Sequence, residues 1–179
     1  MTTRLRTAHT ADLAPAELRA ARALLDEAFE GGFSDEDWEH GLGGMHVLVE
    51  DGRGLAAHGS VVQRRVGYGG RWLRVGYVEA VGVRGDVRRT GLGGRVMAEL
   101  ERIVDGAYDL GALSASAAGA PLYTARGWQL WPGRVCALGP DGVVHLPDEE
   151  GSTFVRPAAA GPLDPVHEVV FDWRDGDVL

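Results

Sequence analysis

Lysine is absent from this chain of 179 residues, and all 18 of its basic residues are arginines. Schiff-base catalysis, pyridoxal-phosphate attachment and the nucleotide-binding P-loop each need the primary amine of a lysine, so the sequence excludes all three. Acidic residues number 26, and the net charge at pH 7 is −8. An acidic chain lacks the basic face that displaces counterions from nucleic-acid phosphates, so we expect no nucleic-acid partner.

Thiols and long apolar runs are also scarce. The single cysteine, Cys136, forms neither an internal disulfide nor a metal site of several thiolates. The six histidines are scattered without ligand spacing, so no metal is expected. The N-terminus lacks the apolar stretch of a signal peptide, and no segment approaches the ~18 apolar residues of a membrane span. We therefore expect a cytoplasmic protein without a membrane partner.

Glycine, in contrast, is abundant. It accounts for 27 of the 179 residues, about 15% against a usual ~7%. Hydrophobic residues make up 45% of the chain, which is enough to build a core. At a typical ~150 residues per domain, this length predicts a single domain over residues 1–179.

Hydrophobic periodicity predicts strands and helices in a mixed order. Asp12 is a candidate cap for the first helix, and the acidic segment 34–39 opens a short helical turn. We expect helices at 15–29, 91–107 and 119–126, and strands at 46–50, 55–68, 72–83, 110–114, 134–138, 152–156 and 167–172. Hairpin strands followed by strand–helix–strand units indicate an α/β or α+β domain on a mixed sheet.

The segment 81–96 is the most informative. A strand ends near Val83, and Gly91, Gly93 and Gly94 then begin a helix, with four arginines in the segment. The first amides of a helix have no internal partner and lie at the positive end of its dipole, so this turn suits an anionic phosphate. The alternative is a glycine-rich connection between strand and helix whose arginines are solvated.

The spacing narrows the choice of phosphate ligand. The dinucleotide fingerprint, started at Gly91, requires a small residue where the chain has Val96. The pattern Arg-x-x-Gly-x-Gly, from Arg88 to Gly93, resembles the pyrophosphate-binding signature of the Gcn5-related N-acetyltransferase (GNAT) superfamily. The later Leu-Tyr-x-x-x-Gly-Trp, residues 122–128, lies where that superfamily has it. The resemblance implies that the turn binds coenzyme A.

Longer segments resemble one branch of that superfamily, the bacterial aminoglycoside 2′-N-acetyltransferases. They extend from end to end of the chain, at 37–46, 63–65, 76–81, 106–114, 126–128 and 172–178. The resemblance implies the GNAT fold, an α/β (α+β) arrangement in which a mixed, strongly twisted sheet of about six or seven strands is flanked by about four helices. Relatives often form homodimers, so the resemblance allows one here.

The implied reaction is direct transfer of an acetyl group from acetyl-CoA to the 2′-amine of an aminoglycoside antibiotic, which gives resistance. Glu79 matches the base, acting directly or through water, and Tyr123 matches the acid beside the CoA sulfur. From pattern alone, Glu79 is a strand residue facing solvent or an arginine, and Tyr123 packs on Trp128. Nothing near Cys136 indicates an activated thiol, so we do not expect a covalent acetyl-enzyme.

The resemblance also implies how acetyl-CoA is held. Backbone groups of Val81 and Val83 hold the pantetheine arm like an added strand, and the Val81 N–H polarises the thioester carbonyl. Amides from Arg88 onward take the pyrophosphate. The implied cofactor-binding residues are Val81, Gly82, Val83, Arg88, Arg89, Thr90, Gly91, Leu92 and Gly93.

Acidic residues gather at 35–37, 148–150 and 175–177, and the terminal carboxylate follows closely. Any one pair is explained by a solvated loop, but a substrate with several ammonium groups needs such clusters for attraction and orientation. The resemblance places these residues in the substrate site: Asp37, Glu79, Ala80, Ser114, Asp148, Glu149, Asp177 and Leu179.

Two departures from the family bear on substrate range. Relatives carry Gly-Asp-Phe where this chain has Gly-Gly-Phe at 31–33, and they often end in tryptophan where this chain ends in Leu179. Fewer carboxylates favour a substrate with fewer amines, such as kasugamycin, over the deoxystreptamine drugs. The alternatives are an acetyltransferase for another small polyamine or a peptide amine, and a non-catalytic module that binds CoA or an antibiotic.

Overall fold

The computed structural model describes residues 2–179, which group into two compact units. Unit 1 comprises the described residues up to Val62 together with Val78–Arg102, and unit 2 comprises Gln63–Tyr77 together with Ile103–Leu179. Three elements contribute to both units: strands β3 (Gly54–Tyr68) and β4 (Arg71–Val83) and helix α3 (Leu92–Ala107). The expectation of one domain over residues 1–179 stays a prediction.

Unit 1 is built on an antiparallel group of strands. Strand β1 (Arg4–His9) pairs with β2 (Met45–Asp51), and β2 pairs with the first part of β3. The Arg84 amide, directly after β4, donates to the Ala56 carbonyl of β3 at 2.9 Å. The buried side chains of β2 and β3 include aliphatic residues such as Val47, Val49 and Ala57, and also the polar residues His46 and His58.

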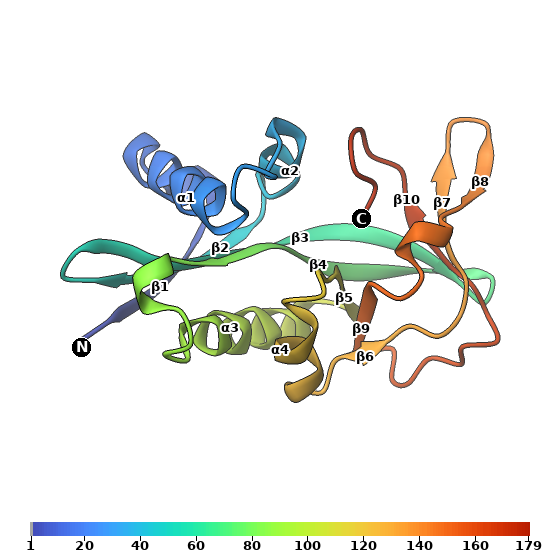
Figure 1. Cartoon of the computed structure of the whole chain (residues 1–179). Helices are drawn as coiled ribbons and strands as arrows, with labels where there is room; N and C mark the ends of the chain where they lie inside the picture. The colour runs from blue at the N-terminus through green and yellow to red at the C-terminus, as the bar shows by residue number, and fades with distance from the viewer. Residues whose placement is uncertain (1) are drawn as a thin grey trace. The chain divides into compact units, whose positions relative to one another are not determined.

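Helices cover both faces of these strands (Figure 1). Helix α1 (Pro15–Ala28) packs at Gly82 of β4, where an added Cβ would lie 2.8 Å from Leu25. The first part of α3 packs at Gly59 of β3, where an added Cβ would lie 2.8 Å from Val96. Glycine is therefore required at both positions because each helix approaches the strand backbone closely.

The start of α1 corrects one expectation. Asp12 does not cap this helix, because it ends a short 3-10 helix, η1 (Thr10–Asp12). The residue before the helix is Ala14, and the Glu17 carboxylate accepts from its amide at 2.8 Å. Pro15 at the first helical position needs no hydrogen-bond partner there, so proline and glutamate together define this start.

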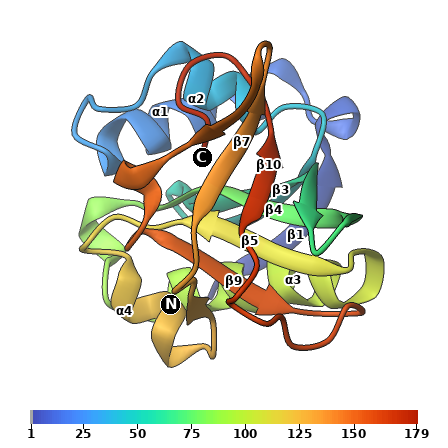
Figure 2. The ribbon, with the colours of Figure 1, turned by 90° about the vertical axis from the view of Figure 1, so that its right-hand side faces the viewer.

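Unit 2 contains the longer mixed sheet, in the strand order β6-β9-β5-β4-β3-β10-β7-β8. β5 runs parallel to β4, and β7 runs parallel to β10, whereas β5 is antiparallel to β9 (Figure 2). Helix α4 (Ala120–Ala125) precedes β6. The further strands are β5 (Leu110–Ser114), β6 (Gln129–Leu130), β7 (Val135–Gly139), β8 (Gly142–His145), β9 (Thr153–Pro157) and β10 (Val169–Asp172).

The predicted fold class is confirmed, and so are the four α-helices, of which α2 spans Asp35–His40. Residues 2–179 form ten strands, more than the expected six or seven. The strands missed are β1, which has few buried residues, β6, which has two residues, and β8, which is mostly exposed. Short or solvated strands carry no strong alternation for a sequence pattern to detect.

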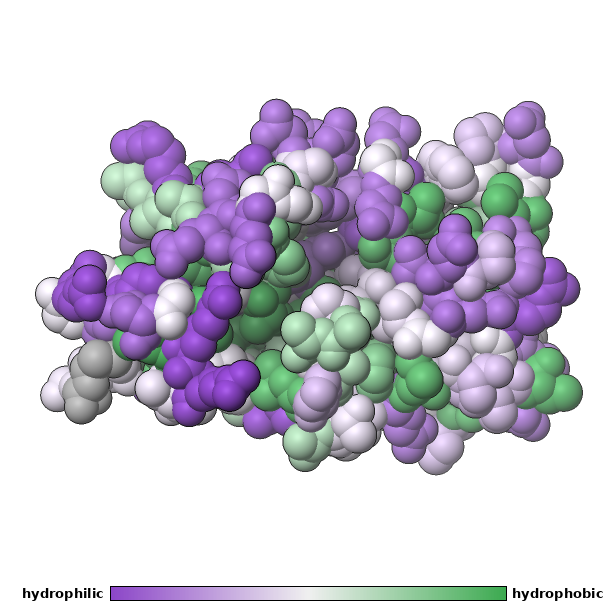
Figure 3. Space-filling view, viewed as in Figure 1, coloured by the Kyte–Doolittle hydropathy of each residue, from purple (hydrophilic) through white to green (hydrophobic). Residues whose placement is uncertain are grey.

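The outward side of unit 1 is polar. Hydrophilic residues gather over α1 and α2 (Figure 3), and the first turn of α2 consists of Asp35, Glu36 and Asp37. None of the helices within residues 2–179 combines the length and the apolar run that a membrane crossing needs.

Candidate active site

Glu79 lies in the second half of β4 and is only 8% exposed. A Cβ added at Gly41, directly after α2, would lie 4.0 Å from the Glu79 Cβ and 3.0 Å from the hydroxyl of Ser60. The carboxylate therefore stands in unit 1 where β3, β4 and the end of α2 meet. A buried carboxylate in an otherwise apolar strand is uncommon, and it makes Glu79 a candidate for proton transfer.

The residue after Glu79 has a strained backbone. Ala80 has φ +41, a left-handed conformation that costs a residue other than glycine about 1–2 kcal/mol. Such strain persists only where surrounding contacts impose it. It interrupts the regular strand just before Val81, Gly82 and Val83, the residues predicted to hold the pantetheine arm.

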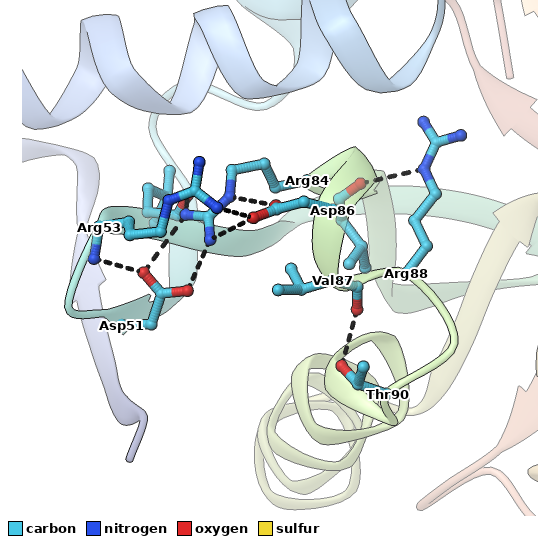
Figure 4. A network of polar contacts seen from close by, with 9 residues as sticks. Asp51, Arg53, Arg84, Asp86, Val87, Arg88 and Thr90 are labelled. Carbon is cyan, nitrogen blue, oxygen red and sulfur yellow. Dashed lines mark hydrogen bonds and ion pairs between the residues drawn. The ribbon is translucent and has the colours of Figure 1, made fainter. Parts of the chain in front are cut away.

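The arginine-rich turn is held by its own ion pairs (Figure 4). Arg84 donates to both carboxylate oxygens of Asp51 and to Asp86, and Arg53 also pairs with Asp86. Arg84 side-chain hydrogen bonds lower the pKa of both aspartates. Arg84 is thus engaged by acidic residues of the protein, and it fixes the short 3-10 helix η2 (Gly85–Val87) that follows β4.

The predicted phosphate turn follows η2 and leads into α3. The Arg88 guanidinium folds back onto two backbone carbonyls, those of Val83 and Ala28, at 3.3 and 3.2 Å. The Thr90 hydroxyl donates to the Val87 carbonyl at 2.7 Å (Figure 4). Gly91 has φ +89, and nothing lies within 4 Å of the position where a Cβ would stand. The turn therefore offers open space beside the first amides of α3, whose helical ladder starts with Arg95 bonding to Gly91.

The predicted cofactor residues 88–93 lie between η2 and the first turn of α3, and their binding of a cofactor stays a prediction. The structure shows which of their side chains are already engaged within the protein. Because the Arg88 and Thr90 side chains bond to backbone carbonyls, backbone amides are the donors that suit a pyrophosphate here. Arg89 is exposed and has φ +61, so its side chain points to solvent from a second left-handed residue.

Tyr123 lies in α4 of unit 2 and is buried. Its ring packs against those of Trp128 and Phe154, with centroids 6.4 and 6.2 Å away. The packing on Trp128 expected from the pattern is therefore present. Burial raises the pKa of Tyr123 to about 12, so the phenol stays protonated at neutral pH, as a proton or hydrogen-bond donor must.

Two of the predicted substrate residues meet in unit 2. The Ser114 hydroxyl, at the end of β5, donates to the Glu149 carboxylate at 3.0 Å, and Ser152 joins the same group. Glu149 ends the 3-10 helix η3 (Pro147–Glu149), whose last carbonyl also accepts from Ser152. The serine hydroxyls orient a partly exposed carboxylate that can accept from an ammonium group.

The other predicted acidic residues lie at the surface. Asp37 shares a capping box with Ser34: its amide donates to the serine hydroxyl and its carboxylate accepts from the serine amide. Asp148 and Asp177 are exposed, and the Asp177 carbonyl accepts from Arg174. These carboxylates keep acceptor capacity for a cationic ligand.

The C-terminal tail is anchored by a residue that the sequence analysis missed. Arg64 of β3 is 4% exposed and donates to the Asp172 carboxylate at 2.8 Å and to the Val178 carbonyl at 2.6 Å. Its guanidinium lies over the rings of Tyr77 and Phe171. Leu179, the last residue, is buried as a result. Along this part of β3, buried residues alternate with more exposed ones, and the buried positions are 64, 66 and 68. This two-residue period was the signal that Arg64 faces the core.

Neither a hollow in unit 2 nor the histidines indicate another catalytic centre among residues 2–179. A hollow of about 670 Å³ in unit 2 is lined by residues around Trp131 and His167, and none of the predicted site residues lines it. Among residues 2–179 no group of three or more histidine, cysteine or acidic side chains is arranged to hold a metal ion. The expectation of no metal stays a prediction.

Comparison with known proteins agrees with this geometry. The family model described as "Acetyltransferase (GNAT) domain" matches residues 9–131, more than half of the chain. A protein from Mycolicibacterium fortuitum, named aminoglycoside 2'-N-acetyltransferase, is 48% identical over 176 residues, which cover 97% of this chain and 90% of that protein.

Solved structures share the fold at low identity. The GNAT family N-acetyltransferase YhbS of Escherichia coli, solved in complex with CoA, superposes with a TM-score of 0.64 at 18% identity, covering 97% of this chain and 90% of that one. A GCN5-related N-acetyltransferase from Kribbella flavida superposes with a TM-score of 0.59 at 22% identity over 74% of this chain, which spans 34% of that protein.

Proposed function

We propose that this protein transfers an acetyl group from acetyl-CoA to the 2′-amine of an aminoglycoside. The chain belongs to the aminoglycoside 2′-N-acetyltransferase family of the GNAT acyltransferases. The observation that carries the substrate class is the 48% identity, over nearly the whole chain, to the mycobacterial relative of that name. The geometry supports the same chemistry, since a buried carboxylate and an open phosphate turn both lie in unit 1.

The residues of the turn fit coenzyme A. The open space at Gly91 lies beside the first amides of α3, which have no partner within the helix and suit a pyrophosphate. The Arg88 amide already donates to the Gly85 carbonyl, so the donors proposed for the pyrophosphate follow it in the chain. Acetyl-CoA supplies the acetyl group as a thioester, and transfer to the amine gives an amide, CoA thiol and one proton. Val81 and Val83 would present backbone groups to the pantetheine arm, and the Val81 N–H would polarise the thioester carbonyl.

Glu79 is the proposed base. The substrate amine is protonated at neutral pH and must lose a proton before its nitrogen has a lone pair for attack. The Glu79 carboxylate takes that proton, directly or through a water molecule, and Ala80 beside it lies in the substrate site. Its burial keeps competing water away and strengthens its interaction with an approaching ammonium group.

Tyr123 is the proposed donor to the leaving sulfur. Its pKa of about 12 lies well above the ~8.5 of an ordinary thiol, so complete transfer of its proton to a thiolate is uphill. A phenol in this environment is better suited to donate a hydrogen bond while negative charge builds on the sulfur.

Direct transfer is favoured over a covalent acetyl-enzyme. Burial and the neighbouring Glu168 raise the pKa of Cys136 to about 11. The thiol, and not the thiolate, is therefore the form present at neutral pH, and a thiol is a poor nucleophile. The substrate amine itself attacks the thioester.

Carboxylates of unit 2 are proposed to receive the remaining amines of the substrate. Glu149, oriented by Ser114, is the best-defined of them, and Asp148, Asp177 and the carboxylate of Leu179 add negative charge. Asp37, which caps α2 in unit 1, keeps its role in substrate binding as a separate expectation from the family resemblance. A polyamine gains both attraction and orientation from such a set.

The narrower proposal is that kasugamycin-type substrates are preferred. Gly31 has φ +82, and Gly32 carries no carboxylate where relatives have aspartate. The site therefore has one amine-binding group fewer than those relatives, which favours a substrate with fewer amines. Antibiotic resistance, a cytoplasmic location and a homodimer remain proposals that accompany the family.

Turnover of acetyl-CoA with a panel of amines, followed by mass spectrometry, tests the proposal. We expect one added acetyl group on an aminoglycoside, and the narrow version requires acetylation of kasugamycin but not of gentamicin-type drugs. Acetylation only of a simple polyamine or a peptide amine would support the alternative enzymes. Binding of CoA and antibiotic without turnover would support the non-catalytic module.

Two variants test the assigned residues. Tyr123→Phe should lower kcat by about 10²- to 10³-fold while CoA affinity is kept, because one donor is lost and the ring stays. Glu79→Gln should lower kcat by about 10²- to 10⁴-fold. Tyr108→Phe, directly after α3, and Glu50→Gln, in β2, are the matched controls and should retain full activity. Equal activity in Tyr123→Phe would refute its role.

A further inference from the structure

A chain of buried polar side chains crosses unit 1 and takes no part in the chemistry above. His46 of β2 and His58 of β3 are each 1% exposed. The His46 Nδ1 lies 2.9 Å from the His58 Nε2, and the His46 Nε2 lies 2.8 Å from the Thr10 hydroxyl. Buried imidazoles need partners for both nitrogens, and this chain supplies them one after another.

Neighbouring backbone groups give the chain a direction. The Thr10 hydroxyl oxygen accepts from the Gly43 amide at 2.9 Å, and its proton has two acceptors within reach, the Gly44 carbonyl at 3.2 Å and the His46 Nε2 at 2.8 Å. The Gly44 carbonyl already accepts from the Thr10 amide at 3.0 Å, so we assign the hydroxyl proton to the shorter contact with the His46 Nε2. His46 then donates from Nδ1 to the His58 Nε2, so that Nδ1 of His58 carries the last proton of the chain.

The two imidazoles are neutral. Burial, followed by the charge of His9, lowers the pKa of His46 to about 4. Burial, followed by His46, lowers the pKa of His58 to about 3, and the backbone of Ala80 opposes that shift. A backbone group that raises the pKa of an imidazole accepts a hydrogen bond from it, so the Ala80 carbonyl is the acceptor that faces His58.

The hydrogen-bonded chain ends at His58, which faces the left-handed residue Ala80 of β4. The His58 Nδ1 is buried and makes no hydrogen bond of standard geometry to another described residue, so the Ala80 backbone is the polar group placed to receive its proton. Ala80, with φ +41, is joined directly to Glu79 and Val81. Left-handed backbone at alanine persists only where its surroundings hold it.

We propose that Thr10, His46 and His58 form a positioning chain that holds the Ala80 peptide in its left-handed conformation and thereby directs the Glu79 carboxylate and the Val81 amide. The three residues touch no substrate and act through the backbone of β4. The effect on catalysis rests on the proposed function of Glu79 and Val81, whereas the effect on the Ala80 backbone does not.

The test compares three substitutions of His58. His58→Phe removes both nitrogens and keeps the ring volume; we expect φ of residue 80 to become negative in its crystal structure and kcat to fall about 10- to 100-fold. His58→Asn places an amide donor where Nδ1 lies, so it should restore most of the activity and the left-handed φ. His58→Gln places its donor at the Nε2 position and should not.

Two further measurements tie the effect to Ala80. In an Ala80→Gly background, where the backbone adopts positive φ without help, His58→Phe should cost at least about threefold less in kcat than it does in the wild-type background. His167→Gln is the matched control, because this exposed histidine of unit 2 packs on the Tyr68 ring, away from Thr10, His46 and His58 in the sequence, and it should keep the wild-type kcat.

Nitrogen-15 NMR of the wild-type protein covers the case in which His58→Phe does not fold. We expect His58 to be the neutral Nδ1–H tautomer from pH 5 to pH 8, and an Nε2–H tautomer or an imidazolium would overturn the proposal. It would also fail if His58→Phe kept both φ of residue 80 and kcat, or if the Asn and Gln variants behaved alike. If φ relaxes in His58→Phe but the wild type acetylates no aminoglycoside, the positioning role stands and the proposed function fails.

Discussion

Two regions of this protein are proposed to bind opposite charges, and they are built in different ways. The turn 84–95 of unit 1 is held by nearby contacts: Arg84 bonds to Asp86 and Thr90 bonds to Val87. The tail 172–179 of unit 2 is held by Arg64, which is 108 residues from Asp172 and 114 from Val178 in the sequence. A short motif therefore predicts the turn, whereas the anchor of the tail depends on the tertiary fold.

The two regions also differ in which groups meet the ligand. In the turn, the Arg84 and Arg88 side chains bond to the protein itself, and neutral backbone amides are the donors proposed for the phosphate. In the tail, the arginine is buried and the carboxylates of Asp175 and Asp177 face outward. The proposed anion site would thus use fixed dipoles at the start of a helix, and the proposed cation site would use formal charges on exposed side chains.

The largest expected effect is on the anchor of the tail. Arg64→Met keeps much of the apolar stem but leaves the Asp172 and Val178 carbonyls without their donor. Unsatisfied buried acceptors cost about 1–3 kcal/mol each, so we expect the free energy of unfolding, measured in urea, to fall by about 2–4 kcal/mol. Hydrogen exchange in residues 172–179 should accelerate more than in the turn.

Arg65→Met is the matched control, because Arg65 is exposed on the other side of β3. Its effect on the free energy of unfolding should stay within about 0.5 kcal/mol. Arg64→Lys should lower the free energy of unfolding about as much as Arg64→Met. A lysine ammonium group cannot reach all three acceptors that the planar guanidinium of Arg64 binds. If Arg64→Met left both stability and tail exchange unchanged, the tail would not depend on this anchor.

The contrast between turn and anchor explains what the sequence could predict. The strands and helices that frame Glu79 and the phosphate turn follow strong local periodicity, and their predicted positions are confirmed within a few residues. Arg64 was missed because arginine is rarely buried, even though the alternation of β3 places it inward. The His46–His58 contact joins two strands, and no spacing along the chain announces it.

Gly91→Ala, in the turn, should have the next largest effect. With φ +89, an alanine there is strained by about 1–2 kcal/mol, and the amides that follow should shift. We expect a loss of about that size in the free energy of unfolding and a higher KM for acetyl-CoA. Gly106→Ala in α3, where a Cβ meets nothing within 4 Å, should instead stabilise by up to about 1 kcal/mol.

If Gly91→Ala changed stability without changing the KM for acetyl-CoA, the strain at this glycine would be structural only, and the phosphate would bind elsewhere. If both variants raised the KM equally, the helix as a whole would matter and not its first turn. Either result would weaken the contrast between an anion site made of backbone amides and a cation site made of charged side chains.

Arg84→Met tests the ion pairs of the turn through pH. Arg84 lowers the pKa of Asp51 and Asp86 below the ordinary 3.8, so their contribution to stability is present above that pH and is lost as pH falls through the lower folded-state values. The stability gap between wild type and Arg84→Met, measured by urea unfolding, should therefore be widest near neutral pH and should shrink toward pH 2. A gap that grows on acidification would contradict this assignment.

The residues of the tail that are proposed to bind substrate should show the smallest effects. Asp177 is exposed, and the interaction of an exposed carboxylate with an ammonium group is worth less than about 1 kcal/mol. Asp177→Asn should therefore raise the KM for the aminoglycoside only about 2- to 5-fold, and added salt should erase the difference because mobile ions screen exposed charges.

Asp141→Asn is the control, because Asp141 is an equally exposed aspartate between β7 and β8, and it should leave that KM unchanged. Because the phosphate turn does not use this carboxylate, the KM for acetyl-CoA should stay constant in both variants. A tenfold or larger, salt-resistant rise in Asp177→Asn would mean that the carboxylate is desolvated in the complex, and the tail would then resemble the turn in being a preformed site.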